Sequence, residues 1–314
     1  MFDRLAKLAF HSITLSSMAV NTWRVQLHSL TLIIKRQLMK ILFTLLVCLT
    51  GFCLQVHSQQ NVQTLKGKKV LVFTKNGKGY VHENIPASIA AIQKLAIQFN
   101  FTADTTTSSA WFTDDVLKQY DAIIFSNTNN DVFDTEEQRV ALMRYMQAGG
   151  GFIGIHSASG TERNWKWFKL MLGATFLRHP PFQPLSIHVL DTTHPAINKL
   201  SLIWQTKDEC YYFKEFNPSI KVLAFTDLSK VKEADDGKNV KPDLFGNRYP
   251  CIWCHVFDGG RVWYTSLGHN KDDYSDPAYL AHIIEGLKWV ADKPKPDYRK
   301  AIATTSFIDE LNVR

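Results

Sequence analysis

Three histidines of this chain, His82, His156 and His269, each stand shortly after a strand-like run of apolar residues. The carboxyl ends of parallel strands meet at one edge of a sheet, which is where open α/β folds bind their ligands. Imidazole titrates near neutral pH and also binds metal ions, so it suits both proton transfer and metal binding. We therefore expect these three side chains to belong to one functional site at that edge.

An acidic pair, Asp208 and Glu209, lies in a connecting segment that could reach the same edge, and Tyr211 follows it closely. A carboxyl group surrounded by aromatic rings can have a raised pKa and act as a general acid or base. A solvated acidic turn is the alternative. We predict four catalytic residues, His82, His156, Glu209 and His269, and six substrate-binding residues, Tyr80, Asn127, Ser157, His179, Asp208 and Tyr211.

The segment 154–158 has the pattern of a strand that turns sharply into a helix, with His156 at the turn. It resembles a nucleophile elbow, in which a tight turn projects one side chain above the sheet. Acyl transfer needs Cys, Ser or Thr at that position. The neighbouring Ser157 would point elsewhere, so the sequence argues against a serine hydrolase and against a thiol-dependent amidotransferase.

The same histidines and Glu209 also suggest a cofactor. Three imidazoles and one carboxylate form a plausible ligand set for a divalent metal such as Zn²⁺. A metal-free site that transfers protons would use the same residue types. The sequence therefore leaves the cofactor open.

Strand-like and helix-like segments alternate along the first part of the chain. Short apolar runs typical of buried parallel strands lie at 69–74, 101–106, 120–126 and 151–155. From residue 185 onward the strand-like runs follow one another, at 185–190, 220–225, 250–257 and 261–266, and Asp258-Gly259-Gly260 between the last two signals a hairpin. This order predicts an α/β fold with a mostly parallel central sheet, helices on both faces and added C-terminal strands.

Local signals mark the helices between these strands. Thr135 and Gln138 have capping-box spacing at the start of a helix, and Asp276 followed by Pro277 should begin the last one. A short helix is expected at 165–172. In the helix at 85–99, apolar residues recur at helical spacing and should form its buried face: Ile85, Ile89, Ile92, Ala96 and Phe99.

The charge of the chain is concentrated in its first part. Residues 1–58 carry six of the 36 Lys and Arg residues but one of the 29 acidic residues, which leaves 30 basic and 28 acidic residues and a net charge of +2 beyond them. A nearly neutral domain has no electrostatic footprint for DNA or RNA. We therefore expect no nucleic acid as partner.

The start of the chain has the layout of a secretory signal peptide. Lys40 precedes an apolar run at 41–54, and a small-residue cleavage pattern ends at Ser58. The run is shorter than the roughly 20 residues that a spanning helix needs, so we expect no stable membrane span in the mature, periplasmic or secreted protein. The predicted organisation is a non-native upstream extension at 1–38, a signal peptide at 39–58, a domain at 59–294 and a loosely packed tail at 295–314.

Export would place the three cysteines after residue 58 in an oxidising compartment. Cys251 and Cys254 have C-x-x-C spacing, but in a strand-like run rather than at the start of a helix, where a redox thiolate would be stabilised. Structural zinc would want a second pair, which the sequence lacks. We expect buried packing cysteines or one disulfide that involves Cys210.

Taken together, the motifs over 68–292 resemble the ThuA-like, or trehalose-utilisation, family. The matching segments are Tyr80-x-His82, the run from Gly149 to Ser157, Arg178-His179-Pro180, Asp208-Glu209 with the aromatic residues after it, and the run from Gly260 to His269. The resemblance implies a flavodoxin-like, class I glutamine amidotransferase-like fold. It also implies a link to the utilisation of disaccharides or keto-sugars, and hence a small-molecule carbohydrate as partner. Family members often have Trp soon after the acidic pair, where this chain has Cys210 and Tyr211.

Two functions follow from these patterns. The first is an exported enzyme, a hydrolase, lyase or isomerase, that uses the His/Glu cluster on a carbohydrate. The second is a non-catalytic sugar-binding or sensing protein, in which aromatic side chains form stacking platforms. The candidates for these platforms are Trp111, Trp165, Trp167, Tyr211 and Tyr212.

Overall fold

The computed structural model describes residues 35–42, 64–234 and 240–307. The chain divides into two units, Met1–Val62 and Gln63–Arg314, and residues 35–42 form a short helix in the first. Most of the predicted upstream extension and signal peptide lies outside the described residues. Within the described ranges, no helix combines the length and the apolar character that crossing a membrane requires.

Within the described part of the second unit, nine strands form one sheet in the order β2-β1-β3-β4-β11-β10-β9-β6-β7. Its parallel half consists of β1 (Lys69–Phe73), β2 (Thr102–Thr106), β3 (Ala122–Ser126), β4 (Gly151–Ile155) and β11 (Gly260–Thr265). Its antiparallel half consists of β6 (Gln183–Val189), β7 (Ile203–Asp208), β9 (Lys221–Asp227) and β10 (Arg248–Phe257). The predicted α/β fold with a parallel core and added C-terminal strands is confirmed.

Three strands are absent from the sequence prediction. Two of them, β5 (Thr175–Arg178) and β8 (Tyr212–Lys214), pair in a small separate sheet. The third is β7, whose residues alternate between exposed and half-buried. Asp208 is the last residue of β7, so the acidic pair does not lie in a connecting loop, as predicted, but at a strand end.

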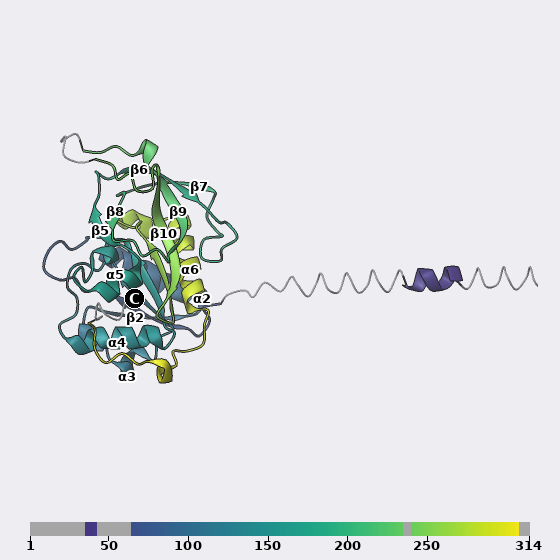
Figure 1. Cartoon of the computed structure of the whole chain (residues 1–314), viewed down its shortest axis with the longest axis horizontal. Coiled ribbons are helices and arrows are strands. Elements are labelled where there is room, and N and C mark those ends of the chain that lie inside the picture. The colour runs from purple at the N-terminus through teal and green to yellow at the C-terminus, as the bar shows by residue number, and fades with distance from the viewer. Residues whose placement is uncertain (1–34, 43–63, 235–239, 308–314) are drawn as a thin grey trace, which may run out of the picture. The chain divides into compact units, whose positions relative to one another are not determined.

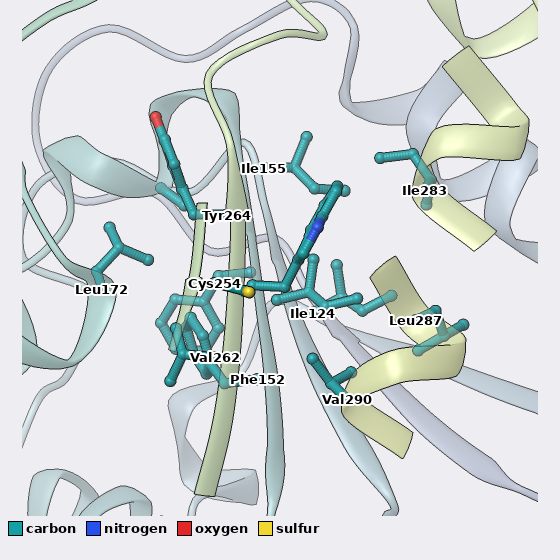
Figure 2. Packing of buried hydrophobic residues seen from close by; sticks show 14 of the residues in the cluster. Ile124, Phe152, Ile155, Leu172, Cys254, Val262, Tyr264, Ile283, Leu287 and Val290 are labelled. Atoms are coloured by element: carbon teal, nitrogen blue, oxygen red, sulfur yellow. The ribbon is translucent and has the colours of Figure 1, made fainter. Parts of the chain in front are cut away.

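Helices cover both faces of the parallel half (Figure 1). They are α2 (Ile85–Phe99), α3 (Asp114–Leu117), α4 (Glu136–Gln147), α5 (Lys166–Leu172) and α6 (Pro277–Ala291). The sheet is buried between them: every residue of β3 and β4 is buried, as expected of central parallel strands. Figure 2 shows Leu172 of α5 and Tyr264 on one side of the sheet, and Ile283, Leu287 and Val290 of α6 on the other.

The hairpin between β10 and β11 has the geometry that its sequence predicts. Phe257 pairs with Gly260, so the loop consists of Asp258 and Gly259. Their φ angles are 49° and 91°, and positive φ at both central residues is what a two-residue type I′ turn requires. After this turn, β11 runs parallel to β4 in the parallel half of the sheet, and His269 lies in the segment that follows its last residue, Thr265.

The helix starts agree with the sequence signals in position but not always in contacts. Asp276 accepts the backbone N–H of Tyr279, and Pro277 opens α6, as predicted. Thr135 precedes α4, but its side chain makes no capping bond. The Gln138 side chain instead accepts the N–H of Asp134 at 2.8 Å. The predicted capping box is therefore wrong, because Gln138 accepts the N–H of Asp134 and not that of Thr135.

The buried face of α2 is turned relative to the predicted one. Ile92 and Ala96 are buried, whereas Ile85, Ile89 and Phe99 are half-buried. Ser88 and two other residues complete the face, and the Ser88 hydroxyl is hydrogen-bonded to that of Ser126 on β3. Small residues let the helix lie close to the sheet, so packing overrides the positions of the largest apolar side chains.

The three cysteines of this unit are buried free thiols, which confirms the packing role and excludes the predicted alternative of a disulfide. Burial raises the pKa of Cys251 and of Cys254 to about 12. Neither thiol is therefore ionised at neutral pH, and the C-x-x-C spacing on β10 has no redox consequence.

The C-terminal tail is not loosely packed, so that prediction is wrong over the described residues up to 307. Ser306 is 2% exposed, and its carbonyl accepts the indole N–H of Trp165 at 2.9 Å. Arg144 of α4 donates to the carbonyl oxygens of Ala301 and Ala303. The Pro- and Lys-rich composition predicted loose packing because it takes no account of backbone carbonyl groups that side chains elsewhere in the chain can bind.

Candidate functional site

Strand β4 ends in a sharp turn that carries His156. The backbone of His156 has a φ of 51°, in the left-handed region that few residues other than glycine adopt. A 3₁₀ turn at His156–Gly160 follows, and the Tyr264 hydroxyl donates a 2.7 Å hydrogen bond to the His156 carbonyl oxygen. This turn has the elbow geometry expected from the sequence, and it places the imidazole beyond the carboxyl end of β4.

The two ring nitrogens of His156 have different partners. Nδ1 lies 2.7 Å from the carbonyl oxygen of Ser266, and because a carbonyl can only accept, Nδ1 carries a proton. In the neutral ring Nε2 then holds a lone pair, and the Tyr211 hydroxyl donates to it at 2.7 Å. Ser266 directly follows β11, the strand that pairs with β4. The backbone at the end of β11 therefore sets the tautomer of the fully buried His156 at the end of β4.

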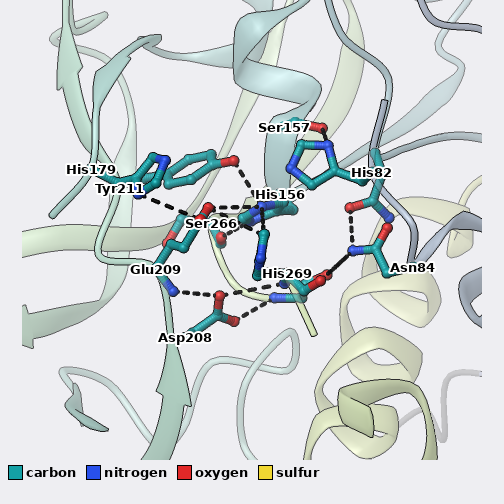
Figure 3. Close-up of polar contacts among 12 residues, drawn as sticks. His82, Asn84, His156, Ser157, His179, Asp208, Glu209, Tyr211, Ser266 and His269 are labelled. Carbon is teal, nitrogen blue, oxygen red and sulfur yellow. Dashed lines mark hydrogen bonds and ion pairs between the residues drawn. The ribbon is translucent and has the colours of Figure 1, made fainter. Parts of the chain in front are cut away.

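Three more side chains converge on Nε2 of His156 (Figure 3). The Glu209 carboxylate lies 3.5 Å from it, and Nδ1 of His269 lies 3.3 Å from it. The centre of the His82 ring is 4.8 Å from that of His156. One N or O atom of each of the four residues lies within 4.8 Å of the others. The structure thus brings together the four residues predicted to be catalytic; their roles stay predictions.

Asp208, predicted to bind substrate, connects two strand ends instead. Its Oδ1 accepts the N–H of Glu209 and its Oδ2 that of Gly268, both at 2.7 Å. Burial raises the pKa of Asp208 to about 6, although the His156 charge and the hydrogen bonds from the backbone oppose the rise. Asp208 therefore holds the end of β7 against the segment after β11, which places Glu209 beside His269.

Asn127, also predicted to bind substrate, makes its polar contacts with other parts of the chain. Its side chain is fully buried and donates to the Tyr274 hydroxyl at 2.9 Å. It accepts from Asn84, which also donates to the carbonyl oxygens of Gly268 and His269. These amides link the end of β3, the loop after β1 and the loop after β11, and so help to position His82 and His269.

The electrostatics favour neutral imidazoles beside an ionised carboxylate. Burial, together with the charges of His156 and His269, lowers the pKa of His82 to about 3. Burial also lowers the pKa of His269, with Glu209 opposing the shift. Burial alone would raise the pKa of Glu209, but contact with His156 and the charges of nearby imidazoles lower it overall. At neutral pH His82 and His269 are therefore neutral and Glu209 is charged.

A cavity of about 390 Å³ opens beside the cluster, within the roughly 300–1,000 Å³ typical of small-molecule sites. His82 and Glu209 reach its wall, whereas His156 lies behind them. Four residues predicted to bind substrate line it: Tyr80, Ser157, His179 and Tyr211. The lining also includes residues that the sequence analysis missed: Asn129, Gly160, Arg163 and Phe176.

Sequence signals exist for some of the missed residues. Asn129 follows β3 closely, so the rule that selected Asn127 also applies to it. Arg163 and Phe176 come from segments without any mark of function, because they reach the cavity only through the path of the chain after the elbow. No pattern in the sequence predicts that path.

The predicted aromatic platforms are mostly core residues. Tyr211 lines the cavity, but Trp165, Trp167 and Tyr212 are buried in the hydrophobic core, and Trp111 packs against that core, half-buried. Trp165 and Trp167 stack on each other with ring centres 5.1 Å apart. The prediction is therefore wrong for four of the five. The aromatic walls of the cavity are instead Tyr80, Phe176 and Tyr211.

The cluster also has the features of a site for a divalent cation. His82, His156, Glu209 and His269 offer three imidazole nitrogens and a carboxylate oxygen, the ligand types of zinc sites. Metal-binding imidazoles usually donate their other N–H to a carbonyl or carboxylate. His156 makes that contact with Ser266. The residues present therefore fit a cation such as Zn²⁺.

A family profile that matches this chain is described as ThuA, and two solved structures with a similar fold are described as ThuA-like. The profile of the ThuA family, described as trehalose utilisation, matches residues 69–290. A protein described as ThuA-like from Bacteroides uniformis ATCC 8492 is 22% identical, with a TM-score of 0.57 over 71% of this chain and 91% of that one. Another, from Parabacteroides merdae ATCC 43184, is 18% identical, with a TM-score of 0.57 over 72% and 90%. No curated protein matches this chain.

The two structures are too distant in sequence to show more than the fold, which they share with this chain. The family profile covers most of the sequence, including all the residues of the His/Glu cluster. This chain therefore belongs to the ThuA (trehalose utilisation) family and has its glutamine amidotransferase-like α/β fold, with a histidine at the elbow.

Proposed function

We propose that this protein is a carbohydrate-processing enzyme whose reaction centre is the cluster of His82, His156, Glu209 and His269. One observation carries the proposal: four reactive side chains from distant segments meet beside a cavity large enough for a sugar. Membership of a family described as trehalose utilisation supports a sugar substrate, either a disaccharide or a keto-sugar.

Glu209 is the group best placed to accept a proton from a sugar hydroxyl or from water. It is ionised and reaches the cavity wall. Its Oε2 lies 3.2 Å from Nδ1 of His269, which can take part in relaying the proton. General acid–base catalysis of this kind contributes roughly 10²–10⁴-fold to a rate. Tyr80, an exposed aromatic residue of the cavity lining, offers a ring on which a sugar can stack.

A divalent cation held by the same four side chains is part of the proposal. Such an ion, when bound, polarises a carbonyl group or activates a water molecule. Elemental analysis of the purified protein should find close to one ion per chain. The variant His269→Gln should bind Zn²⁺ at least about tenfold more weakly in calorimetry. Absence of metal, together with turnover unaffected by chelator, would remove the cation and leave the acid–base site.

The central experiment measures turnover and sugar binding separately in His156→Gln and Glu209→Gln. Trehalose, other disaccharides and their keto derivatives are the substrates to screen. Turnover should fall at least about 100-fold in both variants, while sugar affinity changes little. His188→Gln is the matched control, since this half-buried histidine on β6 stacks on Phe225 and does not line the cavity. Turnover unchanged by the two site variants would refute the proposed reaction centre.

A non-catalytic sugar-binding protein is the second candidate, and the three aromatic walls of the cavity favour it. The same variants separate the two. A binding protein would show no turnover of any sugar by the wild type and nearly full affinity in His156→Gln, because His156 lies behind the cavity wall. An enzyme loses turnover in that variant.

We also propose that the protein is exported to the periplasm or secreted after cleavage near Ser58. The apolar run at 41–54 behind Lys40 supports this. Amino-terminal sequencing of protein recovered from the periplasm or the medium should begin near Gln59. Protein found only in the cytoplasm would contradict export.

A further inference from the structure

We propose that the sugar bound in the cavity carries a carboxylate group, which pairs with Arg163. The presence of a sugar rests on the proposed function, but the charge of the ligand is inferred from Arg163 itself. This residue lines the same cavity as Glu209 and His82. Neither the acid–base chemistry nor the cation requires an arginine there.

Contacts with three other lining residues fix the position of the Arg163 guanidinium at the cavity wall. Its Nε donates to the carbonyl oxygen of Gly160 at 2.9 Å, and its Nη2 donates to Oδ1 of Asn129 at 3.3 Å. The guanidinium also lies over the ring of Phe176, with Cζ 5.5 Å from the ring centre. Gly160, Asn129 and Phe176 all line the cavity as well. The positive charge is therefore positioned before a ligand arrives, which reduces the entropy lost on binding.

The lack of a side chain at Gly160 makes room for this arrangement of Arg163 and Asn129. A Cβ atom on Gly160 would lie 2.5 Å from Oδ1 of Asn129 and 2.8 Å from Nη2 of Arg163. Both distances are shorter than ordinary contacts, so any larger residue would displace the amide or the guanidinium. The absence of a side chain at position 160 is thus what allows Arg163 to lie at this place.

The charge of Arg163 is not neutralised by a carboxylate in the parts of the chain that the structure describes. Other arginines have such partners: Arg139 pairs with Glu162 and Arg178 with Glu233, both at 2.9 Å. The partners of Arg163 are a carbonyl and an amide oxygen, which carry no net charge. Of its five N–H donors, these contacts use two, so the guanidinium keeps donors for a ligand.

Glu209, the acidic residue of the cavity lining, is already engaged elsewhere. Its Oε2 contacts His156 and His269, and its Oε1 lies 3.5 Å from Nδ1 of His179. The cavity therefore has an acidic group turned to the histidines and a basic group without an acidic partner. A ligand with a carboxylate matches this arrangement, because its negative charge meets Arg163 while its hydroxyl groups face Glu209.

The charge of the cavity favours a carboxylate over a phosphate. A guanidinium is planar, and its parallel N–H groups match the oxygens of either anion, so the number of charges decides between them. A phosphate group carries close to two negative charges, and Arg163 is the one permanently cationic side chain among the described residues that line the cavity. A sugar acid is therefore the chemical class that the cavity suits best.

The test is isothermal titration calorimetry of the whole protein with sugars that differ only in oxidation at one carbon. D-Galacturonate is compared with D-galactose, and D-glucuronate with D-glucose. At least one acid should bind the wild type at least tenfold more tightly than its neutral partner. Arg163→Gln should abolish that preference with little effect on the neutral sugar, and Gly160→Ala should weaken binding of the acid. Lys169→Gln is the control, since it removes the same charge from an exposed pair with Glu215.

Each outcome decides the matter. Equal affinity for acids and neutral sugars, or equal weakening of both in Arg163→Gln, would show that Arg163 only supports the cavity wall. Tighter binding of D-glucose 6-phosphate than of D-glucuronate would replace the carboxylate by a phosphate. If neutral sugars bind and are turned over while acids do not bind, this inference fails and the proposed function stands. If none of these sugars, disaccharides or keto-sugars binds, both fail.

Discussion

The two halves of the sheet contribute different chemistry to the candidate site. In the parallel half, His82, His156 and His269 follow the ends of β1, β4 and β11, the position where such sheets place ligand-binding groups. In the antiparallel half, β7 ends with Asp208 and is followed by Glu209, so this half supplies the carboxylate. The comparison teaches that the imidazoles occupy places common to the architecture, whereas the acid depends on the added strands.

The halves are connected at the site by hydrogen bonds rather than by neighbouring sequence. Asp208 accepts N–H groups from Glu209 on its own side and from Gly268 on the other. The small sheet of β5 and β8 adds Phe176 and leads into His179, so the outer wall of the cavity comes from a third element. The site therefore exists only when these separate elements are assembled.

The largest effect is expected from removing one reactive group on each side. His82→Gln and Glu209→Gln should each lower turnover by about 10²–10⁴-fold. The double variant should be hardly worse than the single ones, because groups that act as a unit are not additive. Kinetics on the best substrate of the wild type measures this. Independent, multiplying losses would mean that the two halves serve separate steps.

The next effect should come from Asp208, the contact between the halves. In Asp208→Asn an amide N–H would face the backbone N–H of either Glu209 or Gly268, leaving a buried donor without an acceptor. Unfolding in denaturant should show a loss of roughly 2–3 kcal/mol, with weakened turnover. Asp227→Asn, at the half-buried end of β9 where the side chain caps a 3₁₀ turn, is the control and should lose less than half as much.

A smaller, pH-dependent effect is expected inside the parallel half. His282 on α6 is completely buried, its ring centre lies 4.6 Å from that of Trp263, and burial lowers its pKa to about 3. In the unfolded chain, His282 takes up a proton near pH 6.5. The contribution of the neutral, buried His282 to stability is therefore complete above that pH and is lost progressively as the pH drops from 6.5 towards 3.

His282→Leu should remove this dependence. The difference in unfolding free energy between pH 7.5 and pH 5 should shrink by about 2 kcal/mol relative to the wild type. Denaturant titrations at the two pH values measure it. The variant His188→Gln, in the antiparallel half, should keep the wild-type difference; an equal change there would show that burial of His282 is not the cause.

The smallest expected effects concern the helix caps of the parallel half. Asp276→Ala removes an observed bond to the N–H of Tyr279 and should cost about 1 kcal/mol. Thr135→Ala should cost less than about 0.5 kcal/mol, because the Thr135 side chain makes no capping bond. Thermal or denaturant unfolding compares the two. Equal losses would restore the capping box that the sequence predicts.

Much of the parallel half could be predicted because its signals are local. The apolar runs of β1, β3 and β4 and the Asp258-Gly259 turn lie within segments of a few residues, and so does the elbow at His156. Burial of a whole strand and the conformation of a turn depend mainly on such short stretches. The edge strand β7 was missed because its residues alternate between partial and full exposure and carry little apolar signal.

By itself, the sequence determined which residues stand at the strand ends and that they are imidazoles without a nucleophilic thiol. Only the tertiary structure decided which polar residues face the cavity: Asp208 and Asn127 bind neighbouring backbone and side chains, while Arg163 and Phe176 reach the wall. The physical reason is that a buried polar group takes whatever partner the folded chain brings near it. That partner can lie more than 100 residues away, 110 residues for His156 and Ser266 and 184 for Asn84 and Gly268, and no local pattern encodes it.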